Sequence, residues 1–283
     1  MPHARVGEVS LHYERAGCWA QDPHAPVLVF VNGLLTELGS WAAHLPHFDH
    51  YRCLLWDCRG QGLSDKPAVS EYTVADHARD LAGLLDRLEL RAPVALIGLS
   101  NGAAAALSFA LAQPDRVRAL VVSGAYARVD RALELKLRSW IQAMRAGGGA
   151  LRFDVATPWV FGPQFLAENW AALALFRERA MSLDLDAARR LIAGALLHQL
   201  DDAQLGRIRA ATLVSVGEDD VLTPPSMART LAAAIPGARL ELLAEAGHAA
   251  ALERVEAFCD QTRGFLDPIM HARRHEQTRG GSA

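Results

Sequence analysis

The chain has 283 residues, of which 51% are hydrophobic and 22% are charged, and its formal net charge is −3. This is the composition of an ordinary globular protein, and the near balance of charge argues against nucleic acid as the main partner. The length allows one large domain or one domain with an insertion, since single cores stop growing near this size.

The sequence has none of the marks of a membrane or secreted protein. No apolar run reaches the roughly 18 residues that a membrane helix needs, and the N-terminus lacks the apolar core of a signal peptide. The cysteines, Cys18, Cys53, Cys58 and Cys259, show no paired spacing. We therefore expect a reduced, cytoplasmic protein with free thiols and no membrane span.

Short runs rich in Val, Ile and Leu recur along the chain and predict strands that are buried on both faces. They cover residues 27–31, 53–56, 94–97, 120–122, 212–216 and 240–243. A helix is predicted over residues 73–90, because Thr73 and Asp76 suggest a capping pair and apolar residues then recur on one helical face. Strands that alternate with helices indicate an α/β fold with a mostly parallel, doubly wound sheet.

The alternation of strands and helices stops between residues 126 and 205. Two helical patterns, at 131–145 and 185–200, lie on either side of a Gly147-Gly148-Gly149 break. Aromatic residues gather in this stretch, where they form either a small core or the lining of a pocket. In the second case Trp159 and Phe161 are candidate substrate contacts.

These patterns divide the chain into three parts. We expect a core made of residues 1–125 and 206–267, and a helical cap, residues 126–205, that is inserted into it. Residues 268–283 are charged and then rich in glycine, and we expect them to form a flexible tail.

One serine lies between two glycines in the segment Gly98-Leu99-Ser100-Asn101-Gly102. A predicted strand precedes this segment and a predicted helix, residues 103–111, follows it. Gly-x-Ser-x-Gly at a strand-to-helix turn is the context of a nucleophile elbow, in which the glycines make room for a tight turn. The start of the helix offers unpaired N–H groups that favour a developing oxyanion. Ser100 is therefore the candidate nucleophile, and the alternative is an ordinary loop serine.

A serine nucleophile needs a base, and the base needs an orienting carboxylate. Residues 218–220 are all acidic and directly follow one predicted strand, while His248 follows another. Because the carboxyl ends of parallel strands meet at one edge of the sheet, these groups are expected to meet Ser100 there. The order serine, acid, histidine along the chain also fits an elbow of this kind.

With these residues the chain resembles the α/β-hydrolases that carry a helical cap, over about residues 9–266. Residues 57–67 are similar to the loop that follows the fourth strand in that family. The family's acid lies three residues after a glycine, which selects Asp220 here and leaves Asp219 and Glu218 as its rivals. The resemblance thus implies a catalytic triad of Ser100, Asp220 and His248.

The same resemblance implies an oxyanion hole made of two backbone N–H groups, those of Leu34 and Asn101. Gly33 lets the chain turn before Leu34. Asn32 stands where the family usually has histidine, and this resembles some acyl-transferring members of the family. Asn32 is therefore a further candidate substrate contact.

A serine at the elbow is unlike the family's epoxide hydrolases and haloalkane dehalogenases, which use aspartate there. It suits hydrolysis of a small, partly apolar carboxylic ester, lactone or thioester through an acyl-enzyme. Residues 140–155 are loosely similar to esterases and 3-oxoadipate enol-lactonases. An acyltransferase with the same triad and a non-catalytic small-ligand receptor remain as alternatives. We expect no cofactor, and the sequence does not indicate the oligomeric state.

The remaining histidines are expected to be structural. His44, His47 and His50 recur every three residues, but this spacing does not suit metal ligands and Pro46 interrupts any helix. We therefore expect no metal, and a solvated or half-buried surface at these histidines. His198 is expected to pack or to lie at the surface rather than to act in catalysis.

Overall fold

The computed structural model of the chain describes the backbone of residues 1–279 and the side chains of residues 1–271. Within this part, eight strands form one sheet in the order β1-β2-β4-β3-β5-β6-β7-β8. The pairs β1–β2 and β2–β4 are antiparallel, and all pairs from β4 to β8 are parallel. The strands are β1 His3–Val6, β2 Val9–Gly17, β3 Val27–Val31, β4 Arg52–Trp56, β5 Val94–Leu99, β6 Val117–Ser123, β7 Ala211–Gly217 and β8 Arg239–Leu243.

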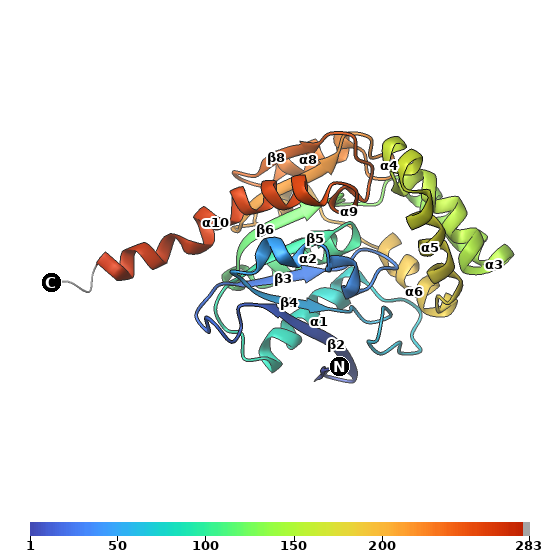
Figure 1. Cartoon of the computed structure of the whole chain (residues 1–283). Helices are drawn as coiled ribbons and strands as arrows, with labels where there is room; N and C mark the ends of the chain where they lie inside the picture. Colours follow the sequence, from blue (N-terminus) through green and yellow to red (C-terminus); the bar gives the residue numbers. More distant parts are fainter. Residues whose placement is uncertain (280–283) are drawn as a thin grey trace.

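Helices cover both faces of the sheet, as the alternating pattern predicts (Figure 1). Neighbouring residues of β3 point to opposite faces, so Val29 packs in the layer with α1 and α2, whereas Phe30 packs in the layer with α10. The covering elements are η1 Leu38–Trp41, η2 Leu45–Phe48, α1 Val74–Arg87, α2 Asn101–Ala112, η3 Pro114–Arg116, α8 Pro225–Ala234, α9 Ala250–Glu253 and α10 Val255–Arg279.

The predicted helical insertion lies between β6 and β7, at the carboxyl end of β6 and beside the end of the sheet (Figure 1). It contains α3 Arg131–Val160, α4 Pro163–Glu168, α5 Trp170–Met181 and α6 Leu185–Leu196, and the short α7 Asp202–Leu205 follows. The predicted glycine break is confirmed as a kink inside α3. Gly147 and Gly148 leave the helical region there, and Gly148 has a φ of 69°.

Two features near the chain ends differ from the sequence expectation. β1 and β2 were not predicted, because their residues mix charged and apolar side chains; in β2 only part of the strand is buried. The tail boundary at 268 is wrong, because α10 continues through Pro268 and Met270 packs into the core with 6% exposure. The packing of Ile269 and Met270 against the core outweighs the helix-breaking tendency of Pro268.

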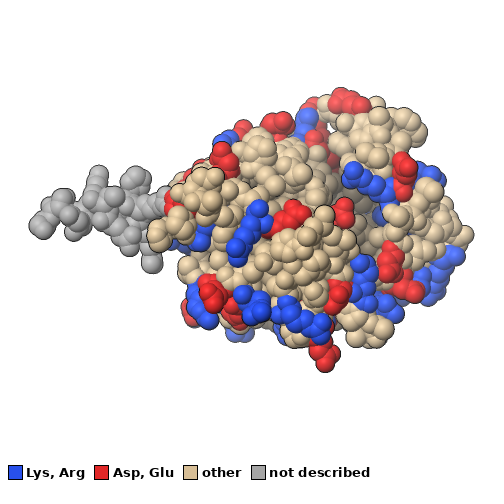
Figure 2. Space-filling model, turned by 60° about the horizontal axis from the view of Figure 1, so that its bottom comes forward, with Lys and Arg blue, Asp and Glu red and all other residues tan. Residues whose placement is uncertain are grey.

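No helix within the described residues is both long enough and apolar enough to cross a lipid bilayer. On the face shown in Figure 2, basic and acidic side chains are interspersed. The same view shows a hollow where the helical insertion meets the sheet domain.

Candidate active site

Ser100 occupies the sharp turn between β5 and α2. Its backbone has φ 54° and ψ −116°, a conformation that non-glycine residues rarely adopt and that is held only where the surroundings enforce it. Its N–H donates to the carbonyl of Ser123 at 2.8 Å, which fixes the turn to the neighbouring strand β6. Ser100 itself is partly exposed, whereas Leu99 and Asn101 on either side are buried.

The two glycines of the elbow are required by close packing. A Cβ on Gly98 would lie 2.7 Å from the backbone of Ala103, and a Cβ on Gly102 would lie 2.2 Å from the carbonyl oxygen of Val31. Neither approach leaves space for a side chain. The elbow expected from Gly-x-Ser-x-Gly is therefore present as a local structure.

His248 and Asp220 form a buried pair. Nδ1 of His248 lies 2.9 Å from Oδ2 of Asp220, and the two residues are 5% and 2% exposed. The other carboxylate oxygen accepts the backbone N–H groups of Leu222 and Thr223, at 2.9 and 2.8 Å. These bonds fix the carboxylate in the orientation that receives the imidazole.

The structure separates Asp220 from its rivals. Glu218 and Asp219 are exposed, and the backbone N–H of Asp219 is bonded to the carbonyl of Ala246. Asp220 alone of these acids has its side chain directed to His248. The choice of Asp220 as the histidine's partner therefore agrees with the geometry.

The end of β6 and the residue after it contact both Ser100 and His248. Ser123 accepts the N–H of Ser100, and the next residue, Gly124, lies under the imidazole of His248. A Cβ on Gly124 would come within 2.9 Å of Cε1 of that ring. The structure thus brings the serine turn and the His248–Asp220 pair to the same edge of the sheet.

Thr223 is a site residue that the sequence pattern did not identify. Its hydroxyl lies 2.9 Å from Oδ2 of Asp220, 2.9 Å from Nδ1 of His248 and 3.1 Å from the carbonyl oxygen of Gly124. It therefore positions both members of the pair. A threonine three residues after an acid gives no local signal of this role, because Gly124 is remote in the sequence.

The first candidate oxyanion donor is the backbone N–H of Asn101. Asn101 is the first residue of α2, so its N–H lies outside the hydrogen-bond ladder of the helix and at its positive end. Its side chain is held by Tyr126, whose hydroxyl donates to Oδ1 of Asn101 at 2.8 Å. This contact fixes the start of α2 against the beginning of the insertion.

The second candidate donor is the N–H of Leu34, whose direction is set by the preceding carbonyl. The carbonyl oxygen of Gly33 accepts Nε2 of Gln61 at 2.5 Å and the hydroxyl of Thr36 at 3.0 Å. In a planar trans peptide the N–H points opposite to the C=O. Because the Gly33 carbonyl is held by Gln61 and Thr36, the Leu34 N–H is held in the opposite direction. Gln61 was also missed by the sequence reasoning.

Asn32 does not fit the expected role of a substrate contact. Its side chain is 1% exposed, and its Oδ1 accepts the indole N–H of Trp41 at 2.9 Å. Its amide nitrogen donates to the carbonyl of Trp56 at 3.0 Å and lies 3.3 Å from Asp57. Both polar atoms of the side-chain amide are therefore hydrogen-bonded to other residues of the protein. Asn32 is therefore a structural anchor of the loop after β3 that carries Leu34, which corrects the sequence expectation.

The two aromatic candidates pack in different parts of the insertion. Phe161 stacks on Phe165 and Phe176, with ring centroids 5.0 and 6.2 Å apart, in a small apolar cluster. Trp159 packs against the main core and lies under Nζ of Lys136, 5.7 Å from the ring centroid. Phe161 therefore belongs to a small apolar core, which is one of the two alternatives that the sequence left open. A contact between Trp159 and the substrate stays a prediction.

The structural histidines have distinct environments. His44 is fully buried and its Nε2 bonds the carbonyl of Ala251 at 2.8 Å, so the expectation of a solvated or half-buried position is wrong for this residue. Burial lowers the pKa of His44. His198 packs edge-on against Tyr126 and burial lowers its pKa to about 4, in agreement with a packing role. Cys53, Cys58 and Cys259 are buried free thiols.

Comparison with known proteins identifies the family to which this fold belongs. The family model of the alpha/beta hydrolase fold matches residues 26–255. The crystal structure of the enol-lactonase from Burkholderia xenovorans LB400 superposes with a TM-score of 0.86 and 29% identity, over 94% of this chain and 100% of that one.

Two curated relatives have similar coverage. A 2-hydroxy-6-oxononadienedioate/2-hydroxy-6-oxononatrienedioate hydrolase of Paraburkholderia xenovorans is 30% identical, over 92% of this chain and 91% of its own length. RutD of Stutzerimonas stutzeri, whose name assigns it provisionally to carbamate hydrolysis, is 29% identical, over 88% of this chain and 93% of its own length. The family match, the sheet and the elbow agree, and the chain belongs to the α/β-hydrolase fold family.

Proposed function

We propose that this protein is a serine hydrolase that cleaves a small, partly apolar carboxylic ester or lactone through an acyl-enzyme. The observation that carries the proposal is the buried His248–Asp220 pair beside the strained turn of Ser100. A histidine oriented by a carboxylate is what a serine hydroxyl needs to become a nucleophile. The family relationship supports hydrolysis as the reaction class.

In the first half of the proposed reaction, Oγ of Ser100 attacks the carbonyl carbon of the substrate. With Nδ1–H directed to Asp220, Nε2 of His248 takes the serine proton. The N–H groups of Leu34 and Asn101 stabilise the oxyanion of the tetrahedral intermediate. The carbon–oxygen bond then breaks, and the imidazolium returns the proton to the leaving alkoxide.

In the second half, water attacks the acyl-enzyme and His248 accepts its proton. The second tetrahedral intermediate collapses, the bond to Oγ of Ser100 breaks, and the proton passes from the imidazole to the serine oxygen. A carboxylic acid leaves. The carboxylate of Asp220 stays ionised and stabilises the imidazolium in both halves.

The surroundings of the loop after β3, which carries Leu34 and Leu35, favour a partly apolar substrate. Leu34 and Leu35 are half-buried and pack against Tyr72 and against Leu191 of α6, in the insertion. Loop and insertion thus meet through apolar side chains. A substrate bound between them would contact mainly aliphatic and aromatic groups.

One arginine of the insertion, Arg152, has a buried nitrogen without an acceptor among the described residues. Nε of Arg152 is buried without a hydrogen-bond acceptor, no ion pair involves Arg152 among the described residues, and burial lowers its pKa to about 10. Arg152, Ala156 and Trp159 follow each other at helical spacing on α3, and the last two pack against the main core. We propose that Arg152 binds a carboxylate of the substrate, remote from the ester or lactone bond.

A relative supports this substrate class, because the hydrolase of Paraburkholderia xenovorans is named for a dioate, which has two carboxylates. The test compares p-nitrophenyl acetate with mono-p-nitrophenyl glutarate, which adds a carboxylate. Arg152→Met is expected to raise KM for the glutarate at least about tenfold, the loss of one charge-assisted contact, and to leave the acetate unchanged. An equal change for both esters would remove Arg152 from the substrate site without affecting the hydrolase proposal.

An acyltransferase and a non-catalytic receptor are the alternatives, and carbamates or carbon–carbon bonds next to a carbonyl are alternative substrates. Product analysis separates them. The purified chain is incubated with ester, lactone and carbamate substrates, with and without an added alcohol. A hydrolase releases the free acid in both cases. Ester exchange that outruns acid release would identify a transferase, and binding without turnover would identify a receptor.

A further inference from the structure

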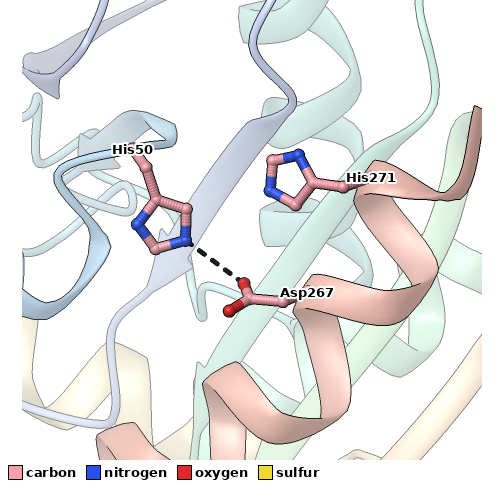
Figure 3. Close-up of side chains that lie close together, drawn as sticks. All are labelled: His50, Asp267 and His271. Carbon is pink, nitrogen blue, oxygen red and sulfur yellow. Dashed lines mark hydrogen bonds and ion pairs between the residues drawn. The ribbon is translucent and has the colours of Figure 1, made fainter. Parts of the chain in front are cut away.

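A second group of chemistry-bearing side chains lies far from the elbow. His50, just before β4, and Asp267 and His271, on α10, each offer an atom that can ligate a metal, and these three atoms lie within 4.8 Å of one another. Figure 3 shows the two imidazole rings and the carboxylate directed to one common space. Nε2 of His50 lies 3.2 Å from Oδ1 of Asp267.

The chain holds this group in place through neighbouring side chains. Asp267 and His271 are one helical turn apart, so they lie on the same face of α10. The hydroxyl of Tyr51 donates to Oδ1 of Asp267 at 2.7 Å, which orients the carboxylate. Nδ1 of His50 lies 3.4 Å from the carboxylate of Asp49, the kind of outer contact that orients a ligating histidine through its other nitrogen.

We propose that His50, Asp267 and His271 bind a Zn²⁺ ion. Two imidazole nitrogens and one carboxylate are a donor set that suits zinc, with water as the fourth ligand. Ligand atoms around tetrahedral zinc lie about 3.4 Å apart, since each bond is about 2.0–2.1 Å long. A spread of at most 4.8 Å closes to that distance by small side-chain rotations. His50 and Asp267 are about two-fifths exposed and have room for them.

The position of the site indicates a structural role. His50 precedes the amino end of β4, whereas the elbow and the His248–Asp220 pair lie at the carboxyl ends of the strands. A strand of five residues spans about 16 Å, so the two sites lie at opposite edges of the sheet. An ion at this position would fasten the end of α10 to the sheet domain.

The three-residue spacing of His44, His47 and His50 in the sequence does not predict this site. Of the three regularly spaced histidines, only His50 belongs to the group, and His44 is buried with its Nε2 bonded to the carbonyl of Ala251. The partners of His50 lie 217 and 221 positions further along the chain, on one turn of α10.

The test is a calorimetric titration of the full chain, without a polyhistidine tag and after treatment with a chelator, with Zn²⁺ alone. One ion per chain is expected to bind. His50→Ala, His271→Ala and Asp267→Asn are each expected to weaken binding by at least about tenfold, the lower end of the effect of losing even a supporting group. Zn²⁺ is also expected to raise the Tm of the wild type and not that of His50→Ala.

Two controls make the result specific. His47→Ala removes a histidine of the same segment that is not in the group, and it is expected to bind zinc like the wild type. Mg²⁺, which prefers oxygen ligands, is expected not to bind. Melting of each variant without metal establishes that it is folded. Absence of saturable Zn²⁺ binding to the wild type would overturn the proposal. So would a Zn²⁺ affinity of the His50→Ala and His271→Ala variants that equals that of the wild type, which would show an ordinary surface ion pair.

Discussion

The carboxylate of Glu253 accepts the backbone N–H of Gly247 at 3.0 Å, directly before the candidate base His248. The same carboxylate accepts the N–H of Gly162 at 2.8 Å, directly before α4 in the insertion. Burial raises the pKa of Glu253, because removal from water disfavours its charged form. One side chain thus joins the helical insertion to the loop of the histidine.

Replacing Glu253 by Ala is expected to leave both glycine N–H groups without an acceptor. The free energy of unfolding should fall by about 2 kcal/mol, since one unsatisfied, partly buried donor costs about 1–3 kcal/mol. kcat should fall as well, because the loop of His248 loses its anchor. Urea denaturation and steady-state hydrolysis measure the two effects. Glu253→Gln keeps one acceptor oxygen and should lose less; equal kcat in all three proteins would contradict the role.

Separate replacement of Asp219 and Asp220 by asparagine tests which carboxylate orients His248. Asp220→Asn is expected to lower kcat by about 10⁴-fold, because the amide no longer holds the histidine tautomer whose Nε2 is basic. Asp219→Asn should leave kcat unchanged, since that side chain is exposed. The two variants make the same chemical change, from carboxylate to amide, at adjacent positions. A large loss in the Asp219 variant alone would reverse the assignment.

Gln61 offers a test of the oxyanion hole that does not touch the triad. In Gln61→Leu the carbonyl of Gly33 loses its 2.5 Å hydrogen bond, and the N–H of Leu34 is less firmly oriented. We expect kcat to fall by about tenfold or more with little change in KM, because the oxyanion exists only in the transition state and the intermediate. Gln61→Glu, which keeps the shape without the donor, should behave like Gln61→Leu. A rise in KM alone would place Gln61 in substrate binding.

Two buried histidines predict a loss of stability in acid. Burial lowers the pKa of His77 and of His198 from 6.5 to about 4, so the folded protein resists protonation where the unfolded chain accepts it. The unfolded state then binds more protons, and the free energy of unfolding falls as pH falls from 6.5 towards 4. Between pH 7.5 and 5 each histidine contributes about 2 kcal/mol to this fall.

The measurement compares urea denaturation at both pH values for the wild type, His77→Leu and His198→Phe. Each variant should have a smaller difference between the two pH values than the wild type. His24→Phe changes an exposed histidine and should keep the wild-type difference. Unchanged pH dependence in the His77 and His198 variants would show that these histidines take up protons in the folded state.

The strands and the elbow could be predicted because their signals are local. An apolar run such as β5 is buried along its whole length, and the two glycines around Ser100 reflect contacts within or beside the turn. β2 was not predicted because it is only partly buried, so its polar residues hide the pattern.

The supporting residues of the site could not be predicted, because each acts across a long distance in the chain. Gln61 bonds Gly33, which is 28 residues away, and Thr223 bonds Gly124, which is 99 residues away. Asn32 was misassigned for the same reason, since its partners Trp56 and Asp57 come together with it only after the sheet has formed. The cytoplasmic location and the identity of the substrate stay predictions.

If Ser100 is the nucleophile, it carries the acyl group of the intermediate, and trapping the acyl-enzyme identifies the residue that carries it. The protein is mixed with a p-nitrophenyl ester, quenched in acid within the first turnovers, and analysed by intact and peptide mass spectrometry. We expect one added acyl group, located on the peptide that contains Ser100. Ser100→Ala should show no adduct and a loss of kcat on the order of a millionfold. Hydrolysis at the wild-type rate by Ser100→Ala, or an adduct on another residue, would exclude Ser100 as the nucleophile.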